Sequence, residues 1–262
     1  MDYAQTFYLK PSSIQSNSNK NQTSHNIQQF ILQNNSNLPW STSSTTTTAI
    51  YVIQINLAKS KVATAHLAKL ASEININHFL VREPYVKEGK IAGVSRNWHQ
   101  WLSSNNKTGI ISLPSTNNPI FICSTTNLAA IKIQTITGPV NLISAYSSPY
   151  AELQDTAHDL ANLLTNIGPE QALIGADRNA PSRLWVYANN SPRGNIMEDL
   201  ISGLYLHLLN EKISEPTFRR RNAMGWPYLT LVKGVNWLEL HLRKSGMNLV
   251  RVTINIFILN WE

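Results

Sequence analysis

Cysteine is nearly absent from this sequence, and long apolar runs are absent altogether. The single cysteine, Cys123, excludes an internal disulfide and any zinc site built from several cysteines. Its apolar neighbours Phe121 and Ile122 predict that this thiol is buried. No opening segment resembles a signal peptide, and no stretch is long enough to span a bilayer. We therefore expect an intracellular protein without a membrane partner.

Charged residues are also scarce, at 14% of 262 residues, and acids are the scarcer kind. Lys and Arg number 22 against 15 Asp and Glu, which gives a formal net charge of +7. This balance favours a polyanionic partner, although it bears on association and not on fold. Hydrophobic residues make up 42%, enough for the core of one large domain or two small ones.

The chain changes character near residue 49. The first 48 residues are rich in Ser, Thr, Asn and Gln and offer little to offset the entropy of ordering. We therefore predict a disordered leader over residues 1–48 and a folded domain over residues 49–262.

Apolar segments bounded by turn residues predict a strand-rich domain. Helical spacing of Ala63, Leu67, Leu70 and Ile74 predicts one helix, and two more are predicted near 150–166 and 194–208. Strands are predicted at residues 50–55, 79–81, 110–113, 120–123, 129–133 and 140–146, just before Asp177, and near 228–233, 235–242 and 248–259. The pattern favours a layered α/β domain over a regular parallel βαβ fold.

Polar residues stand where several of these apolar strands end: Asn56, Glu83, Tyr146, Asp177 and Asn179. Functional sites of layered α/β folds gather at strand ends. If the last strand persists through Asn179, Asp177 and Asn179 face the same side. A carboxylate beside a carboxamide can hold a hydrated metal, orient a water or bind a phosphate.

Each of these residues also has a purely structural interpretation. Asn56 could cap the following helix, and Glu83 could be a solvated loop acid. Tyr146 could be a core residue, and Asp177 with Asn179 could form an Asx-rich turn.

Taken together, the order of these residues resembles that of a known family. The matching blocks are Gln54–Leu57, Glu83–Val86, Tyr146–Pro149, Gly175–Ala180, Ser182, Trp185, Pro192–Gly194, Pro216–Phe218 and Leu229–Leu231. They resemble the endonuclease domain of jockey-like, insect-type non-LTR retrotransposons. That domain belongs to the apurinic-endonuclease-like branch of the endonuclease/exonuclease/phosphatase superfamily. The resemblance spans about residues 50–257.

The resemblance implies a DNase I-like, four-layered α/β sandwich of two packed, mostly antiparallel sheets flanked by helices. It implies nicking of target DNA with Mg²⁺ (or Mn²⁺) and a nuclear location. It also implies a companion reverse transcriptase domain, which we do not find in this chain. Glu83 would bind the metal and Asp177 would orient the attacking water, while Asn179, Asn56 and Tyr146 would position the phosphate or the metal-bound water. A small-molecule phosphatase would share the fold and metal, but the blocks around Glu83 and Asp177 argue against it.

Three family positions are changed in this chain. Tyr228 stands where the family has an Asp, and Gly246 and Met247 replace a terminal Asp-His pair. Loss of one acid–base group typically costs about 10²–10⁴ in rate. His207 and His241 fall in a predicted helix and strand and offer no obvious replacement. The sequence thus predicts an impaired endonuclease. The alternative is an inactive remnant that keeps the fold and weak nucleic-acid binding.

Four arginines are candidate contacts to the DNA backbone: Arg193, Arg219, Arg220 and Arg221. The last three could instead form a solvated loop, and Arg193 could instead pair with an acid.

Overall fold

The computed structural model describes residues 50–73, 75–114, 118–135, 138–210, 218–220, 223–225, 228–234 and 254–259. The predicted leader and the predicted strand near 235–242 lie outside these ranges. Gly246, Met247, Arg221 and His241 lie outside them as well.

The first of two large sheets has the strand order β15-β1-β2-β6-β5. Its central strand β1 is parallel to β15 and to β2, whereas β2–β6 and β6–β5 are antiparallel. Successive residues of β1 and β2 alternate between the two faces, and both faces are buried. The bounds of these strands are β1 Ile50–Asn56, β2 His78–Arg82, β5 His99–Leu102, β6 Thr108–Ser112 and β15 Ile254–Leu259.

The second sheet has the strand order β11-β14-β10-β9-β8-β7. Its β9–β10 pair is parallel and its other pairs are antiparallel. Its strands are β7 Ile120–Ser124, β8 Leu128–Thr135, β9 Gly138–Tyr146, β10 Gln171–Asp177, β11 His207–Leu208 and β14 Tyr228–Lys233. The edge strand β7 exposes Ile120 and Phe121 and leaves Cys123 half-buried, so the prediction of a buried thiol was wrong.

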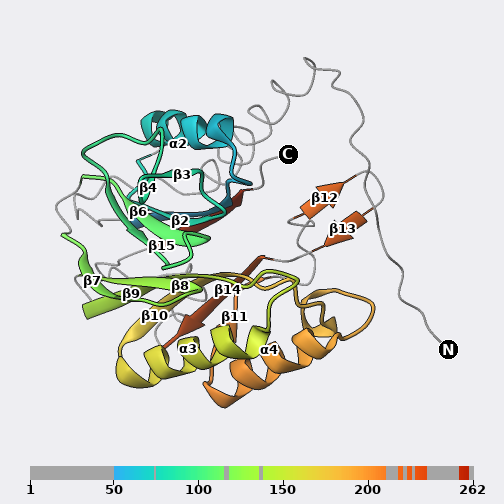
Figure 1. The fold of residues 1–262 in the computed structure, drawn as a ribbon. Coiled ribbons are helices and arrows are strands. Elements are labelled where there is room, and N and C mark those ends of the chain that lie inside the picture. The colour runs from blue at the N-terminus through green and yellow to red at the C-terminus, as the bar shows by residue number, and fades with distance from the viewer. Residues whose placement is uncertain are drawn as a thin grey trace, which may run out of the picture. The chain divides into compact units, whose positions relative to one another are not determined.

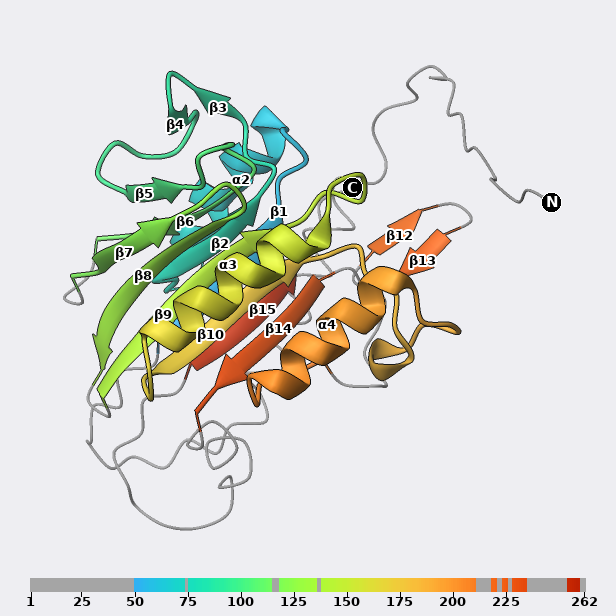
Figure 2. The ribbon, with the colours of Figure 1, turned by 60° about the horizontal axis from the view of Figure 1, so that its bottom comes forward.

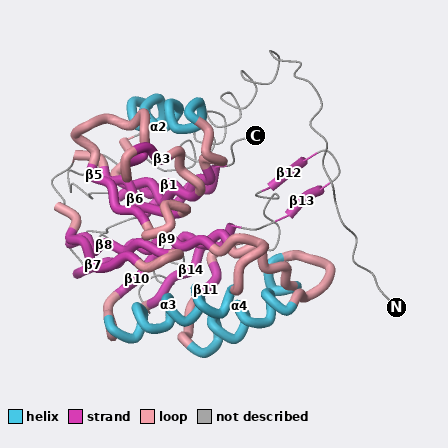
Figure 3. Tube along the Cα trace, viewed as in Figure 1, coloured by secondary structure: helices cyan, strands magenta, loops and turns pink. Residues whose placement is uncertain are grey.

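Helices cover the outer face of each sheet, which gives four layers (Figures 1 and 3). Helix α2 (Lys61–Glu73) covers the first sheet, and helices α3 (Leu153–Asn166) and α4 (Pro192–Gly203) lie across the second (Figure 2). The smaller elements are β3 Val86–Lys87, β4 Lys90–Ile91, the 3₁₀ turn η1 Arg183–Trp185, β12 Phe218–Arg220 and β13 Ala223–Gly225. Within the described ranges, every helix is too short or too polar to cross a lipid bilayer.

Two apolar clusters hold the layers together. One lies between the sheets and joins Val52 and Leu80 to Leu142 and Leu173. The other packs the outer face of the second sheet against α3 and α4, around Leu160, Trp185 and Met197. The predicted four-layered sandwich of mostly antiparallel sheets is therefore confirmed.

The predicted helix near 194–208 was too long. Helix α4 ends at Gly203, and Tyr205 has a left-handed φ of 51°. The backbone N–H groups of Leu204 and Leu206 bond back to Leu200 and Ile201 and close the helix. His207 therefore lies in strand β11 and not in a helix.

Candidate active site

The five polar residues predicted from the strand ends lie together, and we call them the strand-end cluster. Nδ2 of Asn56 donates to Glu83 Oε2 (3.2 Å) and to Asp177 Oδ2 (3.4 Å). The Tyr146 hydroxyl donates to Glu83 Oε1 (3.2 Å), and Asn179 Nδ2 donates to Asp177 Oδ1 (3.1 Å). Each carboxylate oxygen in the cluster therefore accepts a hydrogen bond from another member.

The cluster forms because neighbouring parallel strands end at the same edge of each sheet. Asn56 is the register partner of Arg82, the residue before Glu83, on β1 and β2. Tyr146 is the register partner of Asp177 on β9 and β10. The face-to-face packing of the two sheets brings the two edges together.

The reason expected for the meeting of Asp177 and Asn179 was wrong, although the two side chains do meet. Strand β10 ends at Asp177, and Asn179 has a left-handed φ of 44°. A turn, and not strand alternation, therefore brings the carboxamide back to the carboxylate. Asn tolerates this conformation better than most residues, which explains the residue type at 179.

Two of the structural alternatives are also decided by hydrogen bonds. The Asn56 side chain accepts from Ala58 N (2.8 Å), whereas the start of α2 is capped by Ser60, whose hydroxyl accepts from Ala63 N (3.2 Å). Asn56 is therefore not the helix cap. Glu83 is only half exposed and is bonded on both oxygens, so it is not a solvated loop acid.

Arg82 lies beneath the cluster, between the two sheets, and is fully buried. Its Nη2 and Nη1 donate to the carbonyl oxygen of Gln54 (2.7 and 3.2 Å) when that amide is oriented to suit both neighbours. Gly175 makes the space, because a Cβ there would lie 2.9 Å from Arg82 Nη2. Burial lowers the pKa of Arg82 to about 10, so the guanidinium stays charged at neutral pH.

Tyr228 occupies the floor of the cluster. It is the register partner of Asp177 in the antiparallel β10–β14 pair and is 6% exposed. The Arg82 guanidinium lies 5.7 Å from the centre of its ring. Burial raises the pKa of the Tyr228 phenol, with a further contribution from Asp177, so the group is neutral. A neutral phenol thus faces Arg82 at the position where the family carries an acid.

Burial also governs the protonation of Asp177. The carboxyl is 4% exposed, and desolvation raises its pKa to about 6, against the opposing effects of Arg82 and Asn56. Burial raises the pKa of Tyr146 as well, and the nearby Glu83 carboxylate adds to this. Tyr146 therefore remains a hydrogen-bond donor at neutral pH.

Arg193 is used within the fold. Its Nε donates to the carbonyl oxygen of Asn179 (3.1 Å), and its Nη2 donates to Arg178 O (2.8 Å) and Ser147 Oγ (2.9 Å). Its Nη1 donates to Ala151 O (2.5 Å). It therefore ties the loops after β9 and β10 to the first turn of α4. Arg219 and Arg220 lie on β12, away from the residues that form the cluster.

Sequence reasoning missed a basic rim beside Glu83. Lys59 N donates to Glu83 O (2.6 Å), and Glu83 N donates to Lys107 O (2.8 Å). Lys61 Nζ lies 4.9 Å above the ring of Tyr85. Lys59 and Lys61 are exposed, and their position just after the first strand was the signal that could have identified them.

The cluster fits Mg²⁺ in ligand type, since Glu83 and Asp177 offer hard carboxylate oxygens and Mg²⁺ often takes only one or two such ligands. Its charge fits less well, because Arg82 and Arg178 both interact with Asp177. The described residues hold no group of three or more His, Cys, Asp or Glu side chains arranged to bind a metal. A divalent ion would therefore be held weakly.

Comparison with known proteins agrees with this arrangement. A family model described as endonuclease-reverse transcriptase matches residues 140–246. The solved endonuclease domain of TRAS1, a telomere-specific non-LTR retrotransposon, is 26% identical with a TM-score of 0.63, over 72% of this chain and 87% of that one. A humanized D. rerio TDP2 with 14 mutations matches at 13% identity and a TM-score of 0.48, over 74% of this chain and 84% of that one. No curated protein matches the chain.

The fold and the strand-end cluster define a domain of the endonuclease/exonuclease/phosphatase type. More particularly, the chain has the fold of a non-LTR retrotransposon endonuclease domain, as its sequence predicted. Nuclease domains of this kind imply a nucleic-acid substrate, and endonucleases of the superfamily generally use divalent metals.

Proposed function

We propose that this domain is a DNA endonuclease of the retrotransposon type whose hydrolytic activity is impaired. The observation that carries the proposal is Tyr228 at the register position opposite Asp177. A nucleic-acid partner, specifically DNA, a nuclear location and a companion reverse transcriptase domain belong to the same proposal.

The strand-end cluster supplies the surviving half of the chemistry. Asp177, with a pKa raised to about 6, is suited to accept a proton from an attacking water near neutral pH. Asn56 and Asn179 each donate to one of its oxygens and fix its orientation. Tyr146 and Asn56 do the same for Glu83, the residue proposed to hold Mg²⁺ or Mn²⁺. When bound, such an ion offsets the charge that builds on the phosphate.

The second half of the chemistry is missing at three positions. The Tyr228 phenol is neutral and packed against Arg82, so it cannot orient a histidine as a carboxylate would. The histidine position is Met247, whose thioether neither donates nor accepts a proton. Met247 and Gly246 lie outside the described residues.

A plasmid-nicking assay with Mg²⁺ tests the proposal. The native chain is compared with a restored variant carrying Tyr228→Asp, Gly246→Asp and Met247→His, and with Asp177→Ala in each background. We expect the restored variant to nick at least about 100-fold faster than the native chain. Asp177→Ala should abolish that gain.

The other outcomes are equally informative. Rapid nicking by the native chain that Asp177→Ala abolishes would refute the impairment. Salt-sensitive DNA binding without nicking in either background would favour the inactive remnant. A folded native chain that neither nicks nor binds DNA would refute the proposal itself.

A further inference from the structure

Positive charge exceeds negative charge in the buried layer beneath the strand-end cluster. Arg82 and Arg178 are both fully buried, and both interact electrostatically with Asp177. Asp177 is the one acid among the buried residues of the described ranges. Burial lowers the pKa of Arg82 to about 10 and that of Arg178 to about 9, so both remain cations at neutral pH.

The other charged groups around Asp177 do not cancel this excess. Glu83 and Arg193 are both half-buried and oppose each other in sign. Glu152, which acts on Arg193, is exposed to solvent and therefore strongly screened. The Tyr228 phenol carries no charge, so the layer keeps about one uncompensated positive charge.

The two guanidinium groups also keep unused donors. Among the described residues, Nε and both Nη atoms of Arg178 lack a hydrogen-bond partner, as does Nε of Arg82. Leaving a charged group buried without partners is costly, typically more than 1–3 kcal/mol for each unmet donor. Such an excess of buried cationic charge is a standing attraction for an anion at the open end of the cluster.

We propose that the cluster binds a nucleic-acid phosphate directly, without a divalent metal, and that Arg82 and Arg178 supply the attractive charge from beneath. The two arginines act through space as positioning residues for the phosphate and do not touch it. The field that attracts a phosphate repels a divalent cation, so the cluster favours the anion over the ion. The inference relies on the proposed function only for the identity of the anion.

Fluorescence anisotropy with a labelled DNA duplex tests this on the full native chain. Titrations are run in EDTA and in Mg²⁺ at matched ionic strength, because backbone binding depends steeply on salt. We expect the two dissociation constants to agree within about twofold. A loss of tenfold or more in EDTA would overturn the inference while leaving DNA binding, and the proposed function, in place. Absence of binding under both conditions would overturn both.

Arg82→Gln removes the charge while leaving an amide that can still bond to Gln54. We expect binding in EDTA to weaken by about tenfold and to become dependent on Mg²⁺. Arg96→Gln is the matched control, since Arg96 is exposed and its neighbour Trp98 stacks on Phe79, toward the opposite end of β2. Arg96→Gln should change neither value beyond twofold. Equal effects of the two substitutions would overturn the inference.

Asp177→Asn gives a second test that does not depend on the stability of the Arg82 variant. Removing the buried negative charge should tighten DNA binding in EDTA by about tenfold if the cluster is an anion site. A site that holds phosphate through a metal would lose affinity instead. Weaker binding by a folded Asp177→Asn chain would therefore refute the inference.

Discussion

His78 makes the stability of the domain depend on mildly acidic pH. Its ring is fully buried at the start of β2, with Nδ1 2.7 Å from the hydroxyl of its register partner Ser112. Among the described residues, Nε2 has no hydrogen-bond partner. Burial lowers the pKa of His78 from 6.5 to about 4.

The sign of the effect follows from proton uptake. Between pH 6.5 and pH 4 the unfolded chain binds a proton at His78 that the folded chain does not, so folding stability falls as pH falls. The full difference of about 2.5 pKa units corresponds to about 3 kcal/mol, of which about 2.5 kcal/mol is lost between pH 7.5 and pH 4.5. Asp177 has the opposite sign, because its raised pKa lets the folded chain bind the extra proton.

The difference between two proteins therefore isolates His78. Urea unfolding is measured at pH 7.5 and pH 4.5 for the native chain and for His78→Asn, which keeps a hydrogen-bonding atom near the position of Nδ1. The loss of unfolding free energy on acidification should be about 2.5 kcal/mol larger in the native chain. Equal losses in the two proteins would refute the assignment of a buried, neutral histidine.

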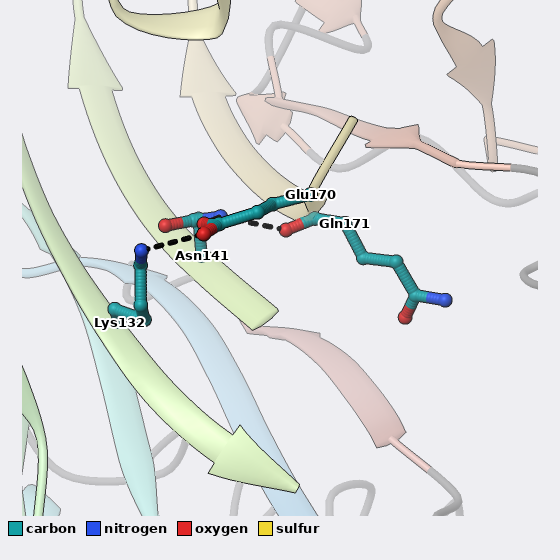
Figure 4. A network of polar contacts seen from close by, with 4 residues as sticks. All are labelled: Lys132, Asn141, Glu170 and Gln171. Atoms are coloured by element: carbon teal, nitrogen blue, oxygen red, sulfur yellow. Dashed lines mark hydrogen bonds and ion pairs between the residues drawn. The ribbon is translucent and has the colours of Figure 1, made fainter. Parts of the chain in front are cut away.

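Two further predictions concern stability. Gly194→Ala should lower the unfolding free energy by about 3 kcal/mol, since its Cβ would lie 2.0 Å from the carbonyl oxygen of Pro181. Gly203→Ala in the same helix meets nothing within 4 Å and should raise it by about 0.5 kcal/mol, and similar effects of the two in thermal melts would contradict the packing. Glu170→Gln should cost about 1 kcal/mol at pH 7, because Glu170 accepts from Lys132 Nζ (2.7 Å) and Asn141 Nδ2 (2.9 Å) (Figure 4). The pKa of Glu170 is lowered by these bonds, so the cost should be present above pH 4.5 and disappear as pH falls below it; a cost that persists in acid would contradict this origin.

Most of the fold could be predicted because its strands are continuous apolar runs between turn residues. The strands predicted at 50–55, 79–81, 129–133 and 140–146 all lie within observed strands. Strand β5 was not predicted, since it carries His99 and Gln100 and is only partly buried at the edge of its sheet. The overlong helix at α4 came from apolar spacing that continues through Leu206, where the backbone has already turned.

The site could be predicted as a set of residues more readily than as a geometry. Polar residues at the ends of apolar strands identified all five members of the cluster. Arg82 could not be recognised, because its place in the strand gives no sign that Gly175 on the other sheet leaves it room. Arg193 had two open interpretations, and its four bonds to loop oxygen atoms depend on a tertiary contact that no local pattern encodes.

The amide of Asn56 joins carboxylates that belong to different sheets, since Glu83 follows β2 and Asp177 ends β10. The distance between these two acids is thus fixed by the apolar layer between the sheets. Selection for a stable core is therefore enough to preserve this half of the site after selection for catalysis has ended. The positions at 228, 246 and 247 had no such protection. In a decaying copy, an intact arrangement of acids records the persistence of packing and is a poor measure of retained activity.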